Sequence, residues 1–194
     1  AAGTSLAGQC VGNGIVVDVS KYMNRILEIN AEEGWVRVEP GVIRDELNHV
    51  LKEYGFFFGP NTSTANRAMI GGMVGNNSCG TTSIVYGSTR DHVQELEVVL
   101  SDGSTAVFHG LDEAGFRQKL EAEGLEGDIY RHLNQTLSVP GFHHRHQDTC
   151  GPAAKAKGNR GLRPLQQHTG ITGSRPYSDV IPTFRLRAHG QDHP

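Results

Sequence analysis

The chain has 194 residues, a net charge of −3 and a hydrophobic fraction of 37%, which together allow one domain with a real core. This charge gives no bulk attraction to nucleic acid, and no apolar run approaches the roughly 20 residues that a membrane helix needs. The three cysteines are widely scattered and fit neither a disulfide framework nor a zinc site, so we expect an intracellular, cytoplasmic protein.

The first elements along the chain are predicted to be strands followed by a helix. Residues 14–19 form a β-branched run that is typical of a buried strand. Residues 26–29 and 35–39 alternate on either side of a Glu-Glu-Gly turn, which predicts a hairpin. From residue 43 to residue 54 the apolar positions repeat with helical spacing, and Gly55 is placed to end this helix.

A second hairpin and two further helices are predicted in the next part of the chain. The strands span residues 93–100 and 104–108 and turn at Asp102-Gly103. Helices are expected over residues 111–123 and 129–137. Strands and helices mix without a regular βαβ alternation, so the predicted fold class is α+β.

The composition changes near residue 141. Residues 141–194 contain eight Lys and Arg, three Asp and no Glu, and they hold six of the ten histidines. Their apolar residues follow no period of 2 or 3.6. A domain boundary, a disordered basic tail or a C-terminus foreign to the fold would each explain this change. We favour the last two, because a weakly patterned segment cannot easily repay its ordering entropy.

Two glycine-rich clusters are the candidate binding segments. The first, residues 3–9, lacks the lysine of a P-loop and the spacing of a Gly-x-Gly-x-x-Gly turn. Its backbone N–H groups could cradle a diphosphate, although the cluster taken alone favours an ordinary surface turn. The second, residues 59–64 and 70–80, has too few large side chains to pack a core of its own. It therefore favours a loop whose backbone approaches a flat or charged ligand.

In their order and spacing these clusters resemble the FAD-binding domain of the vanillyl-alcohol oxidase / p-cresol methylhydroxylase superfamily. Within it, the chain is most similar to the group that contains glycolate oxidase, D-lactate dehydrogenase and D-2-hydroxyglutarate dehydrogenase. The similarity covers about residues 1–115. The motifs that carry it are Gly3-Thr4-Ser5-Leu6-Ala7-Gly8-Gln9, Gly59-Pro60, Ile70-Gly71-Gly72-Met73, Asn76-Asn77-Ser78-Cys79-Gly80, Tyr86-Gly87, Glu95-Leu96-Glu97-Val98-Val99 and Asp102-Gly103.

The resemblance implies which residues contact FAD. The loop around the pyrophosphate corresponds to Gly3, Thr4, Ser5, Leu6 and Gly8. The segment along the ribityl chain and the flavin corresponds to Pro60, Ser63, Gly71, Gly72, Asn76, Asn77, Ser78 and Gly80. The motif that closes the cofactor channel corresponds to Tyr86 and Gly87. Residues 1–9 hold no His or Cys that could carry a covalent flavin, so the FAD is expected to be noncovalent.

The resemblance also implies the organisation of the chain. Residues 1–140 are expected to be a partial PCMH-type FAD-binding domain, incomplete at the N-terminus and without the substrate domain. Residues 141–194 are expected to be an irregular or disordered basic tail, and a C-terminus that is not native to the fold stays as an alternative. The family's Gly-Ser-Glu-Gly-Thr segment has no match here. The resemblance places the catalytic His and the metal ligands in the substrate domain, so none is assigned in this chain, and we expect it to be inactive alone.

The function implied for the parent protein is oxidation of a small D-2-hydroxy acid such as lactate, glycolate or 2-hydroxyglutarate. In this chemistry hydride passes from the substrate α-carbon to flavin N5 while a base takes the hydroxyl proton. The implied partners are this substrate and an unidentified electron acceptor. Nucleic acid and an integral membrane segment are not expected, and peripheral attachment of the parent to a membrane is compatible with the resemblance.

Two alternatives remain. One is another flavin enzyme of the same cofactor fold, similar to UDP-N-acetylenolpyruvoylglucosamine reductase, and the other is a non-catalytic FAD-binding fragment. Outside the resemblance, a metal site is a weak candidate because no acidic or cysteine partner has a suitable spacing to His143, His144 and His146.

Three aromatic or sulfur-containing groups are assigned to the core. Trp35 lies in a strand pattern and Phe56-Phe57-Phe58 follows the end of a helix, so both are expected to pack rather than to stack on a flavin. Cys79 lies in the second glycine-rich cluster, where we expect it to be buried as a small packing residue.

Overall fold

The computed structural model describes residues 2–4, 10–138 and 183–190. Five strands form one antiparallel sheet in the order β1 (Ile26–Asn30), β2 (Trp35–Val38), β6 (Phe184–Arg187), β4 (Val93–Val99) and β5 (Thr105–His109). A separate antiparallel pair joins β3 (Phe56–Phe57) and β7 (His189–Gly190). The helical segments are α1 (Arg44–Leu51), η1 (Lys52–Tyr54), α2 (Ile70–Gly75), α3 (Ser83–Tyr86), η2 (Thr89–His92), α4 (Glu113–Glu121) and α5 (Gly124–Leu137). An antiparallel sheet with helices packed on it confirms the α+β prediction.

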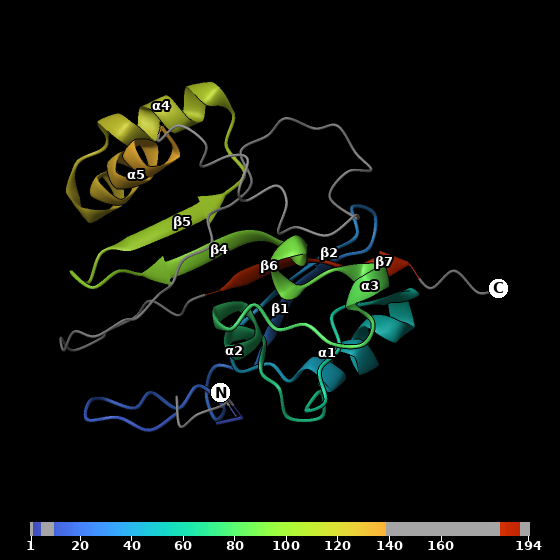
Figure 1. Cartoon of the computed structure of the whole chain (residues 1–194). Helices are drawn as coiled ribbons and strands as arrows, with labels where there is room; N and C mark the ends of the chain where they lie inside the picture. Colours follow the sequence, from blue (N-terminus) through green and yellow to red (C-terminus); the bar gives the residue numbers. More distant parts are fainter. Residues whose placement is uncertain (1, 5–9, 139–182, 191–194) are drawn as a thin grey trace.

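Helices cover the sheet at two places, with α4 and α5 above its β4–β5 part and α1 and α2 below in the view of Figure 1. In the lower core, Leu47 of α1 and Ile70 of α2 pack with Leu186 of β6, and all three side chains are fully buried. In the upper core, Phe116 and Tyr130 pack over the β4–β5 hairpin. Two parts of the second glycine-rich cluster, the loop after β3 and the turn after α2, border the lower core.

The locally encoded elements form as the sequence predicts. The turn between β1 and β2 uses Gly34 at a φ of 68°, where a side chain would be strained, and the Glu33 N–H donates to the Asn30 side chain over 2.9 Å. The helix predicted from residue 43 is α1 continued by η1, and it ends at Gly55 with a φ of 74°. The predicted second hairpin is β4–β5.

The last predicted helix begins earlier than expected, at Gly124 instead of Ile129. The two glycines at 124 and 127 weaken the helical pattern in the sequence. Gly127 nevertheless has a packing role, because a Cβ there would lie 1.9 Å from the carbonyl oxygen of Ala122. The missing side chain lets α5 start close against the end of α4.

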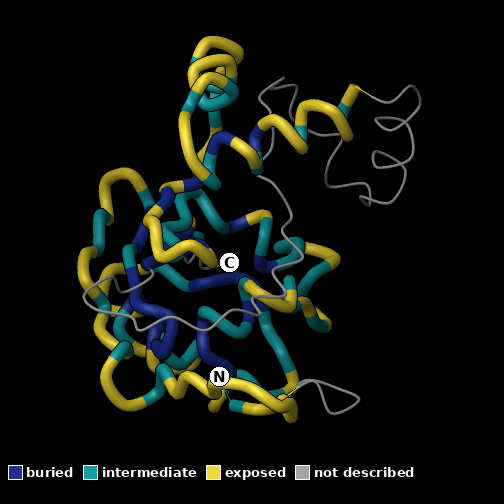
Figure 2. Tube along the Cα trace, turned by 90° about the vertical axis from the view of Figure 1, so that its left-hand side faces the viewer, coloured by how far each residue is buried: buried dark blue, intermediate teal, exposed yellow. Residues whose placement is uncertain are grey.

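The prediction of a buried strand over residues 14–19 is wrong. These residues form no strand, and Ile15 and Val16 are 74% and 81% exposed. Figure 2 shows this N-terminal stretch as an exposed run along one end of the molecule. A strand needs a partner backbone, and no segment within the described ranges pairs with it.

The prediction that residues 141–194 are irregular is wrong for residues 183–190, which contain β6 and β7. Strand β6 lies between β2 and β4, its Leu186 is fully buried, and its Arg185 guanidinium lies 3.8 Å from the centre of the Trp35 ring. Four residues are too short a window for a period to be recognised from the sequence. The rest of this segment, with Cys150, His143, His144 and His146, lies outside the described residues.

Replacing Leu186 with alanine tests whether β6 is an integral strand. Removing a fully buried leucine side chain from the lower core is expected to lower the free energy of unfolding by about 2–5 kcal/mol. The measurement is urea unfolding followed by the fluorescence of Trp35, the single tryptophan. The matched control is Arg187→Ala, whose side chain is exposed on the same strand. Equal unfolding midpoints for the two variants would show that β6 is not part of the sheet.

Candidate functional site

The second glycine-rich cluster lies on three consecutive pieces of the fold. Pro60 and Ser63 lie in the loop after β3, Gly71 and Gly72 lie in α2, and the remaining residues follow in the turn up to η2. In the first cluster Gly3 and Thr4 are described, whereas Ser5, Leu6 and Gly8 lie outside the described residues. The FAD contacts that the resemblance implies for Ser5, Leu6 and Gly8 therefore stay a prediction.

The Phe58–Pro60 stretch is fixed by two polar side chains of α1. The Asn48 side chain accepts from the Phe58 N–H over 2.7 Å and donates to the Phe58 carbonyl over 3.3 Å. The Arg44 guanidinium donates to the Pro60 carbonyl over 3.1 Å. Because these bonds satisfy backbone groups outside any sheet, they hold an irregular segment in one position.

Helix α2 is packed so closely that Gly71 cannot carry a side chain. The Gly71 N–H donates to the Pro40 carbonyl over 2.8 Å, and a Cβ at Gly71 would lie 2.7 Å from the Pro40 Cβ. The neighbouring Ile70 N–H donates to the Val42 carbonyl over 2.9 Å. The protein's own backbone therefore requires this glycine.

The turn after α2 is held from two sides. On one side, a Cβ at Gly80 would lie 1.7 Å from the Asn61 carbonyl oxygen, so the turn touches the loop after β3 backbone to backbone. On the other side, the Ser78 carbonyl accepts from both the N–H and the hydroxyl of Thr89, over 3.0 Å and 2.7 Å. Asn77 has a φ of 46°, which orients its side-chain oxygen to accept from the Arg90 N–H over 3.0 Å.

This rigid turn presents several free donors. The backbone N–H groups of Cys79, Thr81 and Thr82 donate to no acceptor within residues 2–4, 10–138 and 183–190. Cys79 and Thr81 are exposed, so the expectation that Cys79 is buried is wrong. Neighbouring N–H groups without partners form a surface that suits an anionic or carbonyl-rich ligand.

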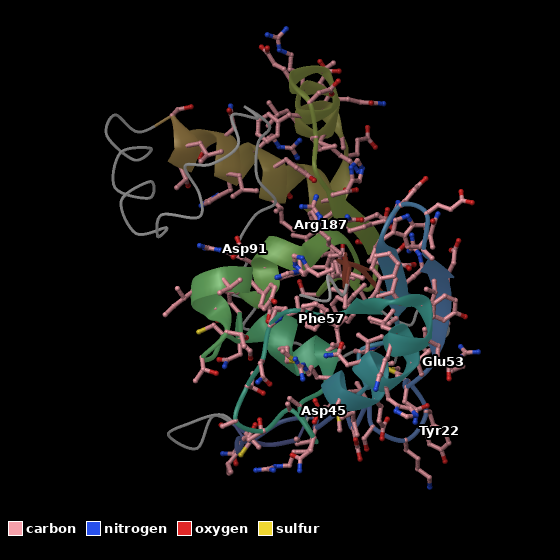
Figure 3. The ribbon with its side chains drawn as sticks, turned by 90° about the vertical axis from the view of Figure 1, so that its right-hand side faces the viewer. Tyr22, Asp45, Glu53, Phe57, Asp91 and Arg187 are labelled. Atoms are coloured by element: carbon pink, nitrogen blue, oxygen red, sulfur yellow. The ribbon has the colours of Figure 1, made fainter. Side chains whose placement is uncertain are left out.

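Tyr86 and Gly87 close this region from the far side of the turn. A Cβ at Gly59 would lie 2.9 Å from the Tyr86 Cβ, so α3 abuts the loop after β3. Gly87 has a φ of 78°, and Asp91 caps the next turn by accepting from the Ser88 N–H over 2.9 Å. Figure 3 labels Phe57, Asp91 and Arg187, which come from β3, η2 and β6.

The sequence analysis missed the side chains that support this site. The backbone of the glycine-rich segments is fixed by Asn48, Thr89 and His92. Asn48 lies in a predicted helix, whereas the segment with Thr89 and His92 was predicted only as a connection. The Ser88–Asp91 spacing is a capping-box signature that could have located η2 in advance. The contacts of Asn48 are formed across the fold and leave no local pattern.

The described part of the chain shows neither a metal centre nor a membrane span. Within it, no three His, Cys, Asp or Glu side chains come together as possible ligands of one metal ion. Of the described helices, none combines the length and the apolar character needed to cross a bilayer.

Comparison with known proteins gives one family and several relatives. The family model described as FAD binding domain matches residues 1–108. D-2-hydroxyglutarate dehydrogenase of Pseudomonas putida is 49% identical over 129 residues, which cover 66% of this chain and 13% of that protein. Glycolate oxidase subunit GlcD of Bacillus subtilis is 41% identical over 131 residues, covering 66% of this chain and 28% of the relative.

A third relative is the mitochondrial D-lactate dehydrogenase (cytochrome) of Kluyveromyces lactis. It is 35% identical over 106 residues, covering 53% of this chain and 18% of that protein. The chain therefore spans only a small part of the length of these three relatives.

The glycine contacts predict that alanine is destabilising at one position of this region and tolerated at another. Gly80→Ala forces a Cβ against the Asn61 carbonyl and is expected to lower the free energy of unfolding by at least about 1–3 kcal/mol. Gly75→Ala, in the same region, meets no atom within 4 Å and is expected to change it by less than about 0.5 kcal/mol. Urea unfolding of both variants gives the comparison, and a stable Gly80→Ala protein would contradict the close approach of the two loops.

Proposed function

Since the chain belongs to the FAD binding domain family, we propose that it holds FAD noncovalently as the cofactor-binding part of a D-2-hydroxy-acid dehydrogenase or oxidase. The single observation that carries the proposal is the set of free N–H donors at Cys79, Thr81 and Thr82. These donors lie inside the range matched by the family and on a turn that glycine contacts fix in place.

The donor set fits the chemistry of FAD. A diphosphate and a flavin ring both present acceptor oxygens, and backbone N–H groups that are already rigid bind them without an ordering cost. We assign the cofactor contacts to the residues that the resemblance implies. Four of them, in and beside the turn with the free donors, are Ser78, Gly80, Tyr86 and Gly87. Gly71 and Gly80 also let the backbone segments approach one another. We propose that the FAD-binding part consists of residues 1–140 together with β6, which lies between two of its strands.

In this proposal the bound flavin supplies the electron acceptor for hydride removed from the substrate α-carbon. The residues of this chain bind and orient it. Asn77 and Thr89 hold the donor turn, and Arg44 holds the Pro60 carbonyl, so the flavin would meet a site that does not rearrange. No residue of the chain is assigned as the base that takes the hydroxyl proton.

The substrate class rests on the relatives. Their names include D-2-hydroxyglutarate dehydrogenase, glycolate oxidase and D-lactate dehydrogenase, which share a 2-hydroxy acid as the compound oxidised. We propose the same class for the whole protein of which this chain is the cofactor-binding part, and we expect the chain alone to turn over no substrate. A cytoplasmic location is proposed with it, consistent with the two exposed free thiols of Cys10 and Cys79.

The visible spectrum of the purified chain tests the cofactor. We expect a flavin absorption band after incubation with FAD and gel filtration, and complete release of the flavin into the supernatant after acid precipitation of the protein. Release separates noncovalent from covalent attachment. Gly75→Ala is expected to retain the band and Gly80→Ala to lose it. A wild-type chain that remains colourless would contradict cofactor binding by this chain.

The substrate class is tested on the whole protein. Anaerobic addition of D-2-hydroxyglutarate, D-lactate or glycolate is expected to bleach the flavin band, whereas the L-enantiomers of the first two acids leave it unchanged. Bleaching by none of these acids would favour the alternative of a different flavin enzyme with the same cofactor fold.

A further inference from the structure

A buried histidine lies directly behind the Tyr86–Gly87 end of the site. His92 is only 2% exposed, and its Nε2 lies 2.7 Å from the Tyr86 carbonyl oxygen. A carbonyl oxygen can only accept, so Nε2 carries the proton in the neutral ring. His92 is therefore held as one neutral tautomer by the residue that closes the site.

His92 is the centre of a cluster of rings that joins separate elements. Its ring centre lies 5.5 Å from that of Phe58 and 4.9 Å from that of His189, both in edge-to-face geometry. The His189 ring in turn lies 5.3 Å from the Tyr86 ring. A Cβ at Gly59 would meet both Tyr86 and His189, at 2.9 Å and 3.2 Å. The cluster thus connects the loop after β3, α3, η2 and β7.

Each of the two imidazoles has one buried ring nitrogen without a hydrogen-bond partner in the described part of the chain. These nitrogens are His92 Nδ1 and His189 Nε2. A neutral ring nitrogen tolerates this position. A protonated one would place a charged donor in a buried position next to a second imidazole, with the Arg187 backbone nearby to favour it, and such a group is costly to bury.

We propose that His92 is a positioning residue of the FAD site, which in its neutral form fixes the Tyr86–Gly87 turn against Gly59, and that protonation of the His92–His189 pair frees this turn and releases the cofactor. The inference rests on the proposed function, because it takes the Tyr86–Gly87 turn as part of the FAD site. It adds a pH-dependent control of cofactor retention.

The charges around the pair set the direction of this control. Burial lowers the pKa of His92, and the neighbouring His189 lowers it further, whereas the Tyr86 carbonyl, Asp91 and the Arg187 backbone oppose this shift. Burial and the Arg187 guanidinium lower the pKa of His189. In the released turn each histidine regains an ordinary pKa of about 6.5 and takes up a proton more readily. The closed form is therefore fully favoured above about pH 6.5 and is lost as the pH falls below it, by up to tenfold per pH unit for each histidine.

The tautomer and the titration can be measured without FAD. Nitrogen-15 NMR of the histidine rings in the whole chain is expected to show His92 protonated at Nε2, with a pKa below 6.5. The Tyr86 resonances are expected to shift at the pH where His92 titrates. A His92 ring protonated at Nδ1, or Tyr86 resonances that do not follow its titration, would overturn the proposal even if the chain never binds FAD.

The dissociation constant of FAD, measured by flavin fluorescence from pH 7.5 to 5.5, gives the second test. We expect it to rise at least about tenfold in the wild-type chain over this range. His92→Gln keeps an N–H donor for Tyr86 and is expected to bind within threefold of wild type at pH 7.5 but with a shallower pH slope. His189→Phe keeps the ring contacts and loses one titrating group, so its slope is also expected to fall.

His92→Phe separates positioning from packing, because it keeps a ring but removes the bond to Tyr86. We expect weaker FAD binding at pH 7.5, at least about tenfold, with an unfolding midpoint like that of His189→Phe. If His92→Phe does not fold, the His92→Gln comparison decides. Wild-type pH slopes in both His92→Gln and His189→Phe would overturn the proposal, whereas absence of FAD binding by the wild-type chain at every pH would contradict the proposed function instead.

Discussion

The antiparallel pairing of β6 with β2 and β4 is the contact on which the rest of the fold depends. Without it the described sheet consists of two separate hairpins, β1–β2 and β4–β5, and a two-stranded hairpin is only marginally stable in water. β6 joins them into five strands and adds Phe184 and Leu186 to the core between the sheet and helices α1 and α2. Polar contacts reinforce the junction, because Arg37 of β2 pairs with Glu95 of β4 over 2.6 Å and Arg185 lies on the Trp35 ring.

On this platform the site is formed by backbone segments that touch one another. Gly59, Gly71 and Gly80 each face another part of the chain, and a Cβ at any of them would lie within 3 Å of it. Two of them, Gly71 and Gly80, are also glycines that the family resemblance assigns to the cofactor, so the same residues let neighbouring backbone segments approach closely. This dual requirement explains how a stretch with few large side chains still has a defined shape.

The sequence predicted the elements whose signals are local. Both hairpins and α1 with its glycine stop were found because their turns and periodicity lie within a few residues. The predictions for residues 14–19 and for β6 were wrong for one shared reason: whether a segment forms a strand depends on a partner strand elsewhere in the chain. The β-branched run at 14–19 lacks a partner within the described ranges, whereas the short Phe184–Arg187 segment has two. The resemblance located the glycine-rich motifs, but the contacts of Asn48, Thr89 and His92 with them are non-local and left no pattern.

The buried polar side chains show how the backbone around the site is held in position. Burying such groups is unfavourable unless they form hydrogen bonds, so each is informative about what it holds. Thr89 binds the Ser78 carbonyl and His92 binds the Tyr86 carbonyl, on either side of the donor turn. Glu39, 1% exposed, accepts from the Arg25 N–H and guanidinium. Although burial raises the pKa of Glu39, the bonds from Arg25 lower it overall, so the carboxylate stays charged.

Glu39 immediately precedes Pro40, the residue against which Gly71 packs, so its bonds also fix the base of α2. Three buried polar groups, Thr89 and His92 of η2 and Glu39 after β2, therefore hold the backbone on which the free donors of the turn after α2 depend. Apolar packing at the same positions could supply comparable stability, but it would not specify the direction of a carbonyl or an N–H group. We expect such buried polar groups where backbone donors must already be in position before a ligand binds.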